Sequence, residues 1–361
     1  MIKRRAHNVF AVTLGLLMAA MFLLAGCGAK GSAGQTDNDN GLEGELNLFI
    51  WSEYMPNDVL ARFEREYGVK VNRSEYSSNE EAMAKISAAG GVYDLAVLSD
   101  YMVDVMIKQK MLDPVDLDKI PNFKNIGEDY KNQPFDPGNR YSVPYMWGST
   151  LIAVDQSKVK DAVTSYADLW RPEFRNSLVV LDDAREVIGM VLQKMGYAKN
   201  ETDPSILEQA KEELQKLMPN IKAFDSDSPK TLLINGEAVA GFIWNGEIPL
   251  AQQGNPNIVP VFPQEGIGLW MDSFVIPQKA PHPKAAHAFI NYVLDPKVSA
   301  EISKAFPYSN PNEAAHQYMD PALLNNPAVY PPKDVVKKGQ YIRDIGEATK
   351  LYDRIWSEVK R

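Results

Sequence analysis

The sequence contains few residues that could bind a metal ion or act as a nucleophile. Among 361 residues there is one cysteine, Cys27, so no disulfide can form within the chain and no cysteine metal site exists. His7 lies close to the N-terminus, and His282, His287 and His316 lack the spacing of metal ligands. Neither a P-loop nor a glycine-rich dinucleotide turn is present. The sequence therefore predicts no metal, no cofactor and no catalytic residue.

An apolar run at the N-terminus is typical of an export signal. Residues 3–5 are basic, Val9 to Leu24 is nearly all apolar, and small residues precede Cys27. This order resembles a bacterial lipoprotein signal, in which the cysteine becomes the lipidated first residue. An uncleaved membrane-anchoring helix is the alternative, but the run is shorter than the roughly 20 residues that span a bilayer. We expect residues 1–26 to be the signal peptide and Cys27 to carry the lipid. The protein would then be anchored to the outer face of the cytoplasmic membrane, or to its periplasmic side in a cell with two membranes.

The segment that follows Cys27 differs in composition from the rest of the chain. Residues 28–41 are small and polar, with no periodic apolar positions, which is typical of a flexible tether over residues 27–41. From residue 42 onwards we expect a globular body, because the chain as a whole is 45% hydrophobic and 24% charged. A body of this length is more typical of two lobes than of one.

The net charge restricts the partners. The chain has a formal charge of −9, which becomes −12 once the three basic residues of the signal are removed. Such acidity argues against binding nucleic acid or lying on anionic lipid. It is compatible with attracting a cation.

Apolar patterns alternate between strand and helix along the body. Strands are predicted at 46–51, 69–71, 93–98, 151–154, 178–181 and 240–244. Helices are predicted at 57–67, 80–89, 103–110, 165–170 and from 182 onwards. This alternation predicts a mainly parallel sheet with right-handed crossovers, and the extended segment 141–148 is the expected first crossing between lobes.

Aromatic and polar side chains follow two of the predicted strands. Trp51, Glu53 and Tyr54 come at the end of one strand, and Ser99 and Tyr101 at the end of another. In open α/β sheets ligands bind just beyond the carboxyl ends of strands. An aromatic–acid–aromatic cluster in that place suits an organic cation. The segment alone leaves open that its aromatics cap the core and that Glu53 is simply solvated.

A pair of acids opens the predicted helix after residue 182. Asp183 and Glu186 are three residues apart and share one face of the first turn. Acids there are favoured by the helix dipole, so capping and ligand binding both remain open.

The pairing of a tryptophan with an acid recurs further along the chain. Trp270 and Asp272 are two residues apart in an extended segment and share a face, with the spacing of Trp51 and Glu53, and Trp244 ends another strand. Indole faces attract cations by roughly 0.5–2 kcal/mol each. Carboxylates supply the charge-assisted hydrogen bonds that a desolvated ammonium needs. Together these groups predict a cage for an elongated molecule with several positive charges.

Six ordered segments resemble the spermidine/putrescine-binding proteins of bacterial polyamine uptake systems, which are periplasmic-type solute-binding proteins. The resemblance extends from Leu46 to the C-terminus. Its most specific segments are residues 51–54 (WSEY), 99–101 (SDY), 145–148 (YMWG), 181–187 (LDDAREV), 243–246 (IWNG) and 270–273 (WMDS).

The resemblance implies an α/β fold of the type II periplasmic-binding-protein class. Each of two lobes would have a central, mostly parallel sheet flanked by helices, with the ligand in the cleft between them. Lobe 1 would comprise residues 42–149 and 271–320. Lobe 2 would comprise residues 150–270 and a C-terminal helical segment, 321–361. The implied function is capture of spermidine or putrescine for the permease of an ABC importer, without enzymatic activity.

The resemblance also implies which residues contact the ligand. By position they are Trp51, Ser52, Glu53, Tyr54, Ser99, Tyr101, Asp183, Glu186, Trp244, Trp270, Asp272 and Tyr308. Asp183 would face a middle amine and Glu186 a neighbouring or terminal one. Ser52 stands where the family commonly has threonine.

The chain departs from the family pattern near its C-terminus. The spermidine binder of the family has a glutamine that contacts a terminal ammonium where this chain has Ile342. Loss of this polar partner favours a shorter diamine, unless Gln340 compensates through a different local backbone.

Two other functions fit the residues less well. A carboxylate pair in a cleft can serve a glycosidase, so an extracellular hydrolase is one alternative. A solute-binding protein for another organic cation is the second. An iron-binding protein of this shape would need clustered tyrosines as oxygen ligands and few tryptophans lining the cleft, which fits this chain poorly.

Overall fold

The computed structural model describes residues 41–361. The predicted signal peptide, Cys27 and all but the last residue of the predicted tether lie outside the described residues. Every element below belongs to the compact unit of residues 37–361. No helix within residues 41–361 has the length and apolar character needed to cross a membrane.

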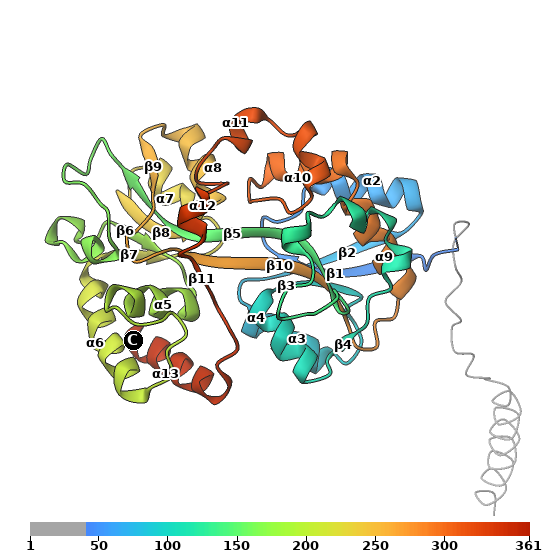
Figure 1. The fold of residues 1–361 in the computed structure, drawn as a ribbon, viewed down its shortest axis with the longest axis horizontal. Helices are drawn as coiled ribbons and strands as arrows, with labels where there is room; N and C mark the ends of the chain where they lie inside the picture. Colours follow the sequence, from blue (N-terminus) through green and yellow to red (C-terminus); the bar gives the residue numbers. More distant parts are fainter. Residues whose placement is uncertain (1–40) are drawn as a thin grey trace, which may run out of the picture. The chain divides into compact units, whose positions relative to one another are not determined.

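One mixed sheet runs through the described part of the chain (Figure 1). Its strands are β1 (Glu45–Trp51), β2 (Lys70–Tyr76), β3 (Leu95–Ser99), β4 (Leu112–Asp113), β5 (Ser142–Asp155), β6 (Leu178–Val180), β7 (Ile221–Phe224), β8 (Ala240–Trp244), β9 (Ile258–Val261), β10 (Gly268–Pro277) and β11 (Gln340–Tyr341). The main order is β2-β1-β3-β10-β5-β8-β6-β7. The outer strands β2-β1-β3 and β8-β6-β7 pair in parallel, as expected from the strand–helix alternation.

The two long strands β5 and β10 hold the halves of the sheet together. They pair antiparallel from Gly268 opposite Thr150 to Val275 opposite Ser142, with an irregularity after Asp272. Every residue of both strands is buried. In Figure 1 they run side by side between the two groups of helices. The predicted crossing segment 141–148 and the predicted strand 151–154 are therefore one continuous strand. The parallel sheets expected for the two lobes are joined into one sheet, because the crossing strands form ladders on both sides.

Helices cover both faces of the sheet. They are α2 (Asn57–Tyr67), α3 (Asn79–Ala89), α4 (Asp100–Lys108), α5 (Ala184–Lys194), α6 (Pro204–Leu217), α7 (Lys230–Ile234), α8 (Glu247–Gly254), α9 (Pro283–Val293), α10 (Pro296–Ala305), α11 (Pro321–Leu324), α12 (Lys333–Val336) and α13 (Thr349–Val359). The predicted capped helix at 165–170 is a 3-10 helix, Tyr166–Trp170, with the capping box of Ser165 and Asp168. The helices predicted at 57–67 and 80–89 correspond to α2 and α3, and the one predicted from 182 onwards corresponds to α5. The helix predicted at 103–110 begins earlier, at Asp100, and ends at Lys108.

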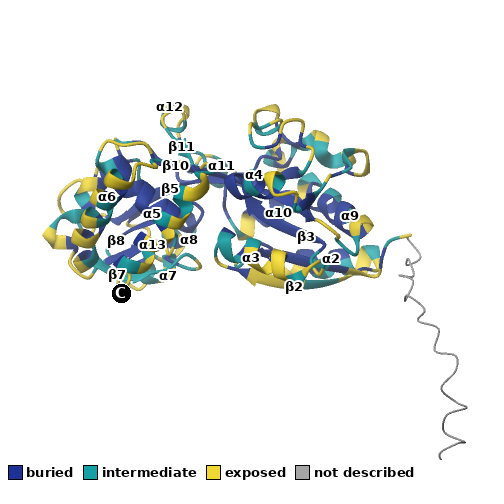
Figure 2. Ribbon diagram, turned by 90° about the horizontal axis from the view of Figure 1, so that it is seen from below, coloured by how far each residue is buried: buried dark blue, intermediate teal, exposed yellow. Residues whose placement is uncertain are grey.

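The buried side chains form separate cores, which define the two lobes. We call lobe 1 the part whose cores surround β1 and β3, and lobe 2 the part whose cores surround β6 and β8. In lobe 1, Leu48 and Ile50 face α2 and α9, whereas Phe49 faces the opposite way, toward α3 and α4. This alternation is that of a strand buried on both faces. Figure 2 shows the buried strands lying beneath helices whose outer faces are exposed. The two-lobed α/β fold is therefore confirmed.

The C-terminal helix belongs to lobe 2. Tyr352, Ile355 and Val359 on α13 are buried in the core that also contains residues of α5 and α6. Figure 1 shows α13 beside these two helices.

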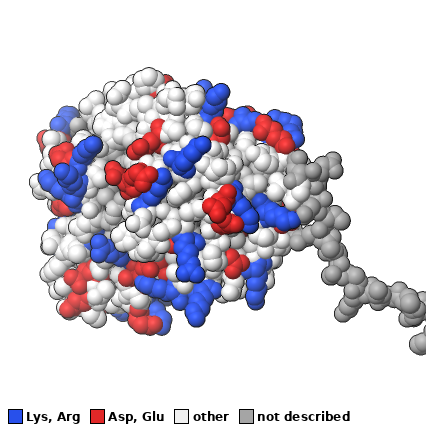
Figure 3. Space-filling model, turned by 45° about the vertical axis from the view of Figure 1, so that its right-hand side comes forward, with Lys and Arg blue, Asp and Glu red and all other residues white. Residues whose placement is uncertain are grey.

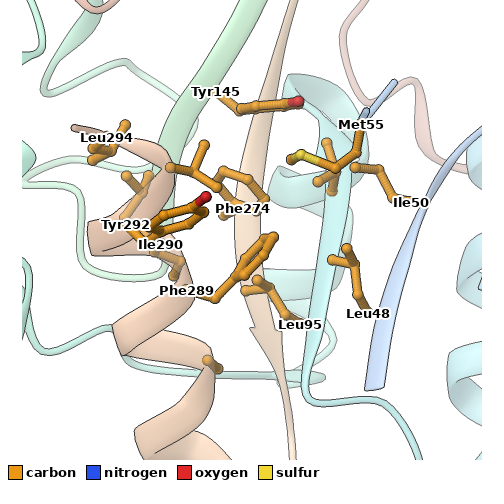
Figure 4. Close-up of a cluster of buried hydrophobic side chains, with 14 of the residues drawn as sticks. Leu48, Ile50, Met55, Leu95, Tyr145, Phe274, Phe289, Ile290, Tyr292 and Leu294 are labelled. Atoms are coloured by element: carbon orange, nitrogen blue, oxygen red, sulfur yellow. The ribbon is translucent and has the colours of Figure 1, made fainter. Parts of the chain in front are cut away.

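The aromatic centre of the lobe 1 core should dominate the stability of that lobe. Phe289 on α9 is fully buried and meets Phe63 of α2 edge-on at 5.0 Å between ring centroids. It also meets Phe274 of β10 at 6.3 Å, and Figure 4 shows its ring between the helix and the strands. We expect Phe289→Ala to lower the free energy of unfolding by about 3–5 kcal/mol, because it leaves a cavity. Urea denaturation measures this change.

Val92→Ala serves as the control, since Val92 is 52% exposed and its truncation should change the free energy of unfolding by less than about 0.5 kcal/mol. A loss below about 1 kcal/mol for Phe289→Ala would contradict the packing described here.

Candidate functional site

The structure brings the predicted site residues together in one cavity. All twelve of them line it, and so do Ser77, Asn79, Asp100, Ser226, Asp227 and Ile342. The cavity has a volume of about 70 Å³, counted as the space open to the centres of water molecules. One water needs roughly 10–15 Å³ of such space, so the cavity accommodates a slender molecule.

The wall from lobe 1 is built at the ends of strands. Trp51 is the last residue of β1, Ser99 is the last residue of β3, and Tyr54 lies in the turn after β1. Asp272 comes from β10, which pairs with β3 so that Asp272 lies opposite Ser99. The predicted position beyond the carboxyl ends of parallel strands thus holds, and the antiparallel strand adds the acid.

Asp272 is held by hydroxyl groups rather than by a cation. The Ser99 hydroxyl donates to Asp272 Oδ1 at 2.6 Å, and the Tyr54 hydroxyl donates to Asp272 Oδ2 at 2.8 Å. Asn79 in turn donates to the Ser99 hydroxyl at 3.0 Å. Burial raises the pKa of Asp272 to about 6, although the two hydroxyl groups lower it. The carboxylate is therefore desolvated and oriented, and it forms no ion pair with any described residue.

Four aromatic rings form a chain of edge-to-face contacts along the cavity. Tyr54 meets Tyr308 at 5.4 Å between centroids, Tyr308 meets Trp270 at 5.4 Å, and Trp270 meets Trp244 at 6.1 Å. Trp244 is fixed by an indole hydrogen bond to the carbonyl of Ser226 at 3.1 Å. The chain starts in lobe 1 and ends on β8 of lobe 2. Rings held in this way offer rigid apolar and π surfaces to a ligand.

The acids of lobe 2 lie at the start of α5. Asp183 is the N-cap of this helix, and its Oδ1 accepts the backbone N–H of Glu186 at 2.9 Å. Burial, together with the nearby carboxylates of Glu186 and Glu80, raises the pKa of Asp183 to about 7. Capping and exposure to the cavity were alternatives in the sequence, but Asp183 does both. It forms no ion pair within the described structure.

Glu186, in contrast, is already paired with a lysine. Lys199 Nζ lies 2.6 Å from Glu186 Oε2, and the Thr150 hydroxyl donates to the same oxygen at 2.8 Å. The side chains of Lys199 and Glu186 are 1% and 2% exposed. The charge that was expected to face a ligand amine is thus compensated inside the protein.

Glu53 is paired as well. Lys230 Nζ lies 2.6 Å from Glu53 Oε2 and 3.0 Å from Glu247 Oε2. Glu53 lies beyond the end of β1 with a positive φ of 49°, so the same-face spacing expected for Trp51 and Glu53 does not apply. The spacing does hold for Trp270 and Asp272, which lie within β10 and both line the cavity.

Polar contacts join the two lobes at the mouth of the cavity. The Ser52 hydroxyl of lobe 1 donates to Asp227 of lobe 2 at 2.6 Å, and the Glu53–Lys230 pair also connects the lobes. The Arg185 guanidinium of α5 lies 5.4 Å from the centre of the Tyr101 ring of α4. These contacts keep the lobes together around the cavity.

Some residues of the site were not predicted from the sequence. Asp100 lies between two predicted residues, and burial raises its pKa well above the usual value, which favours a neutral carboxyl group. Its position at a strand end was the signal that could have found it. Lys199 and Lys230 lie in segments without motif or periodicity, and only the tertiary structure shows that they reach the acids.

The described part of the chain offers no cluster of metal ligands, and the face drawn in Figure 3 carries mixed charge. Residues 41–361 contain no group of three or more His, Cys, Asp or Glu side chains that could hold a metal ion. On the face drawn in Figure 3, basic and acidic side chains are interspersed.

Comparison with known proteins agrees with this geometry. Residues 58–331 match the family model described as bacterial extracellular solute-binding protein. The spermidine/putrescine-binding periplasmic protein of Salmonella typhimurium is 42% identical over 346 residues, which cover 95% of this chain and 97% of that protein.

Solved structures agree on the fold. The spermidine/putrescine ABC transporter substrate-binding protein PotD of Streptococcus pneumoniae superposes with a TM-score of 0.74 at 34% identity, over 88% of this chain and 98% of that chain. The TpPotD lipoprotein of Treponema pallidum gives 0.77 at 30% identity, over 87% and 99%. The chain therefore belongs to the bacterial extracellular solute-binding proteins, in the group of the spermidine/putrescine-binding periplasmic proteins.

Proposed function

We propose that this protein is an extracytoplasmic receptor that binds a polyamine and delivers it to an ABC importer without performing chemistry. One observation carries the proposal: the buried Asp272 and the half-buried Asp183 line an aromatic cavity and have no cationic partner among the described residues. Its relatives are named for binding spermidine and putrescine.

The binding energy would come from restoring the charge balance of the cavity. A buried carboxylate without a partner is costly, and so is a desolvated ammonium, but the two together form strong charge-assisted hydrogen bonds. The methylene chain between the amines would lie against the chain of aromatic rings, whose faces attract the flanking cations.

Lobe closure would couple binding to transport. The Ser52–Asp227 and Glu53–Lys230 contacts would break as the lobes separate, so a ligand that bridges Asp272 of lobe 1 and Asp183 of lobe 2 would favour the closed state. The closed form is the shape that the permease and its ATPase subunits would recognise.

We further propose the cellular arrangement expected from the sequence. The signal at residues 1–26 would direct export, and Cys27 would hold the body at the membrane through its lipid, as the name of the Treponema pallidum lipoprotein supports. We also propose that the chain passes between the lobes at residues 149/150, 270/271 and 320/321.

Titration calorimetry on the tether-free body tests the ligand class. We expect heat and a change in tryptophan fluorescence with putrescine, spermidine or both, because indoles line the cavity. A monoamine of similar length is the control and should bind far more weakly, since it leaves one carboxylate unpaired. If only another organic cation binds, the protein is a receptor for that cation and not for a polyamine. Hydrolysis of a glycoside would support the hydrolase alternative. No response to any amine would overturn the proposal.

Removing the lobe 1 acid or its neighbouring indole should weaken binding. We expect Asp272→Asn and Trp270→Ala each to raise the Kd for the preferred polyamine at least tenfold, which corresponds to about 1.4 kcal/mol. Asp58→Asn is a matched control, because Asp58 is exposed in the first turn of α2 and lies outside the cavity. An unchanged Kd for both site variants would remove them from the site.

The affinity should fall as the pH is lowered through neutrality. Burial raises the pKa of Asp183 to about 7 and of Asp272 to about 6, so both take up protons in the empty protein below these values. The amines stay charged and require the carboxylates. Binding should therefore be strongest near pH 8, weaken between pH 7 and 5.5, and release protons at pH 6.5.

Calorimetry in two buffers of different ionisation enthalpy measures this proton release, and Asp272→Asn should reduce it. We expect the opposite pH trend for the stability of the empty protein. Because the folded pKa values lie above the usual value of 3.8, stability is lost as the pH rises from about 4 to 7. A constant Kd from pH 8 to 5.5 would contradict the raised pKa values.

A further inference from the structure

We infer that the cavity is fitted to a diamine such as putrescine and discriminates against the triamine spermidine, because Lys199 supplies the ammonium beside Glu186 that a third amine would otherwise supply. The inference rests on the proposed function, and it assigns to Lys199 a role as a specificity-determining residue.

The charge of Glu186 is compensated within the protein. Glu186 lines the cavity, but its Oε2 is shared by Lys199 Nζ at 2.6 Å and by the Thr150 hydroxyl at 2.8 Å. Both charged side chains are almost completely buried. A buried pair of this kind is electrically neutral, and separating it leaves an uncompensated charge, which is strongly unfavourable. A ligand ammonium therefore gains little by approaching Glu186, and the nearby lysine repels it.

Contacts with the backbone and the side chain of Lys199 fix its position in the fold. The backbone N–H of Lys199 donates to Gln340 Oε1 at 2.9 Å, and its carbonyl accepts the Tyr352 hydroxyl at 3.4 Å. The side chain crosses α5 at Gly189, where a Cβ would lie 2.6 Å from Lys199 Cγ. Only a glycine leaves this path open. The position of the ammonium is thus set by backbone contacts and by the shape of the helix.

The end of the cavity near the C-terminal segment is lined by an apolar side chain. Ile342 lines this part of the cavity and is buried. Gln340, which could have compensated for the missing polar group, uses its side-chain oxygen to hold Lys199. Gln340 therefore does not offer this oxygen to a ligand amine. Instead it fixes Lys199, the lysine that competes with such an amine for Glu186.

Six carboxyl groups line the cavity, and two of them, Asp100 and Asp227, were not predicted to bind ammonium groups. Of the four predicted to bind ammonium groups, Glu186 is paired with Lys199 and Glu53 with Lys230. Asp183 and Asp272 remain without ion pairs among the described residues. Two carboxylates compensate two ammonium groups, one at each end of a diamine. Of the other two acids, Asp100 has a pKa that burial raises well above the usual value, which favours its neutral form, and Asp227 is exposed at the mouth, where it accepts a hydrogen bond from the Ser52 hydroxyl. A third ammonium would therefore find no further ionised carboxylate inside the cavity, which costs much of the binding energy.

Competitive titration of the wild-type body tests the preference directly. We expect putrescine to bind at least tenfold more tightly than spermidine, with cadaverine closer to putrescine than to spermidine. If spermidine binds as tightly as putrescine or more tightly, the inference is wrong while the proposed polyamine receptor stands. If no amine binds, the proposed function itself fails.

Substitution of the lysine tests its role. Lys199→Ala frees Glu186 for a third ammonium, so the ratio of spermidine affinity to putrescine affinity should rise at least tenfold. The double variant Glu186→Ala/Lys199→Ala removes both charges and should leave the wild-type preference. Lys194→Ala is the control, because Lys194 is the last residue of α5 and pairs with Glu213 outside the cavity. An unchanged ratio in Lys199→Ala would overturn the inference.

A variant that preserves the buried pair guards against misfolding of Lys199→Ala. Ile342→Gln restores a polar partner at the end of the cavity without touching the lysine, and we expect it to raise spermidine affinity less than Lys199→Ala does. If Lys199→Ala does not fold, a double variant that keeps the wild-type preference supports the inference, and one that prefers spermidine overturns it.

Discussion

The antiparallel ladder between β5 and β10 is the interaction on which the site depends. It brings Thr150 beside Glu186 and sets Trp270 and Asp272 between the strand ends of lobe 1 and the helices of lobe 2. The fit is close, because a side chain at Gly148 would overlap the indole of Trp270 and the amide of Asn245. A shift of register by one residue would turn both Trp270 and Asp272 to the other face of the sheet.

Local signals in the sequence were sufficient for β1, β2, β3, β6 and β8 and for α2 to α5. Strands such as β3 are short apolar runs, and helices such as α5 have capping residues and apolar periodicity, so both could be predicted without tertiary information. The junction of the two lobes could not be predicted in this way. Whether β5 and β10 form separate sheets or one depends on pairing between residues more than 100 positions apart, for which periodicity carries no information.

The site shows the same division. Acids and aromatics at strand ends could be predicted, because their positions follow from the topology of parallel sheets. Their charge state could not. Lys199 and Lys230 reach Glu186 and Glu53 across 13 and 177 positions of sequence, and each converts an apparent ligand contact into an internal pair. Counting carboxylates in a sequence therefore overestimates the charge that a cavity offers.

The continuity of the sheet also determines how the lobes can move. A flexible loop as hinge would allow rotation about many axes, but β5 and β10 are joined by hydrogen bonds and are buried along their whole length. Separation of the lobes must bend and twist this two-stranded ribbon while its ladder stays intact. Such a ribbon bends most easily across its flat face, so opening and closing would follow one dominant path. The mouth contacts of Ser52 and Glu53 would then meet their partners again in the same geometry each time the cleft closes.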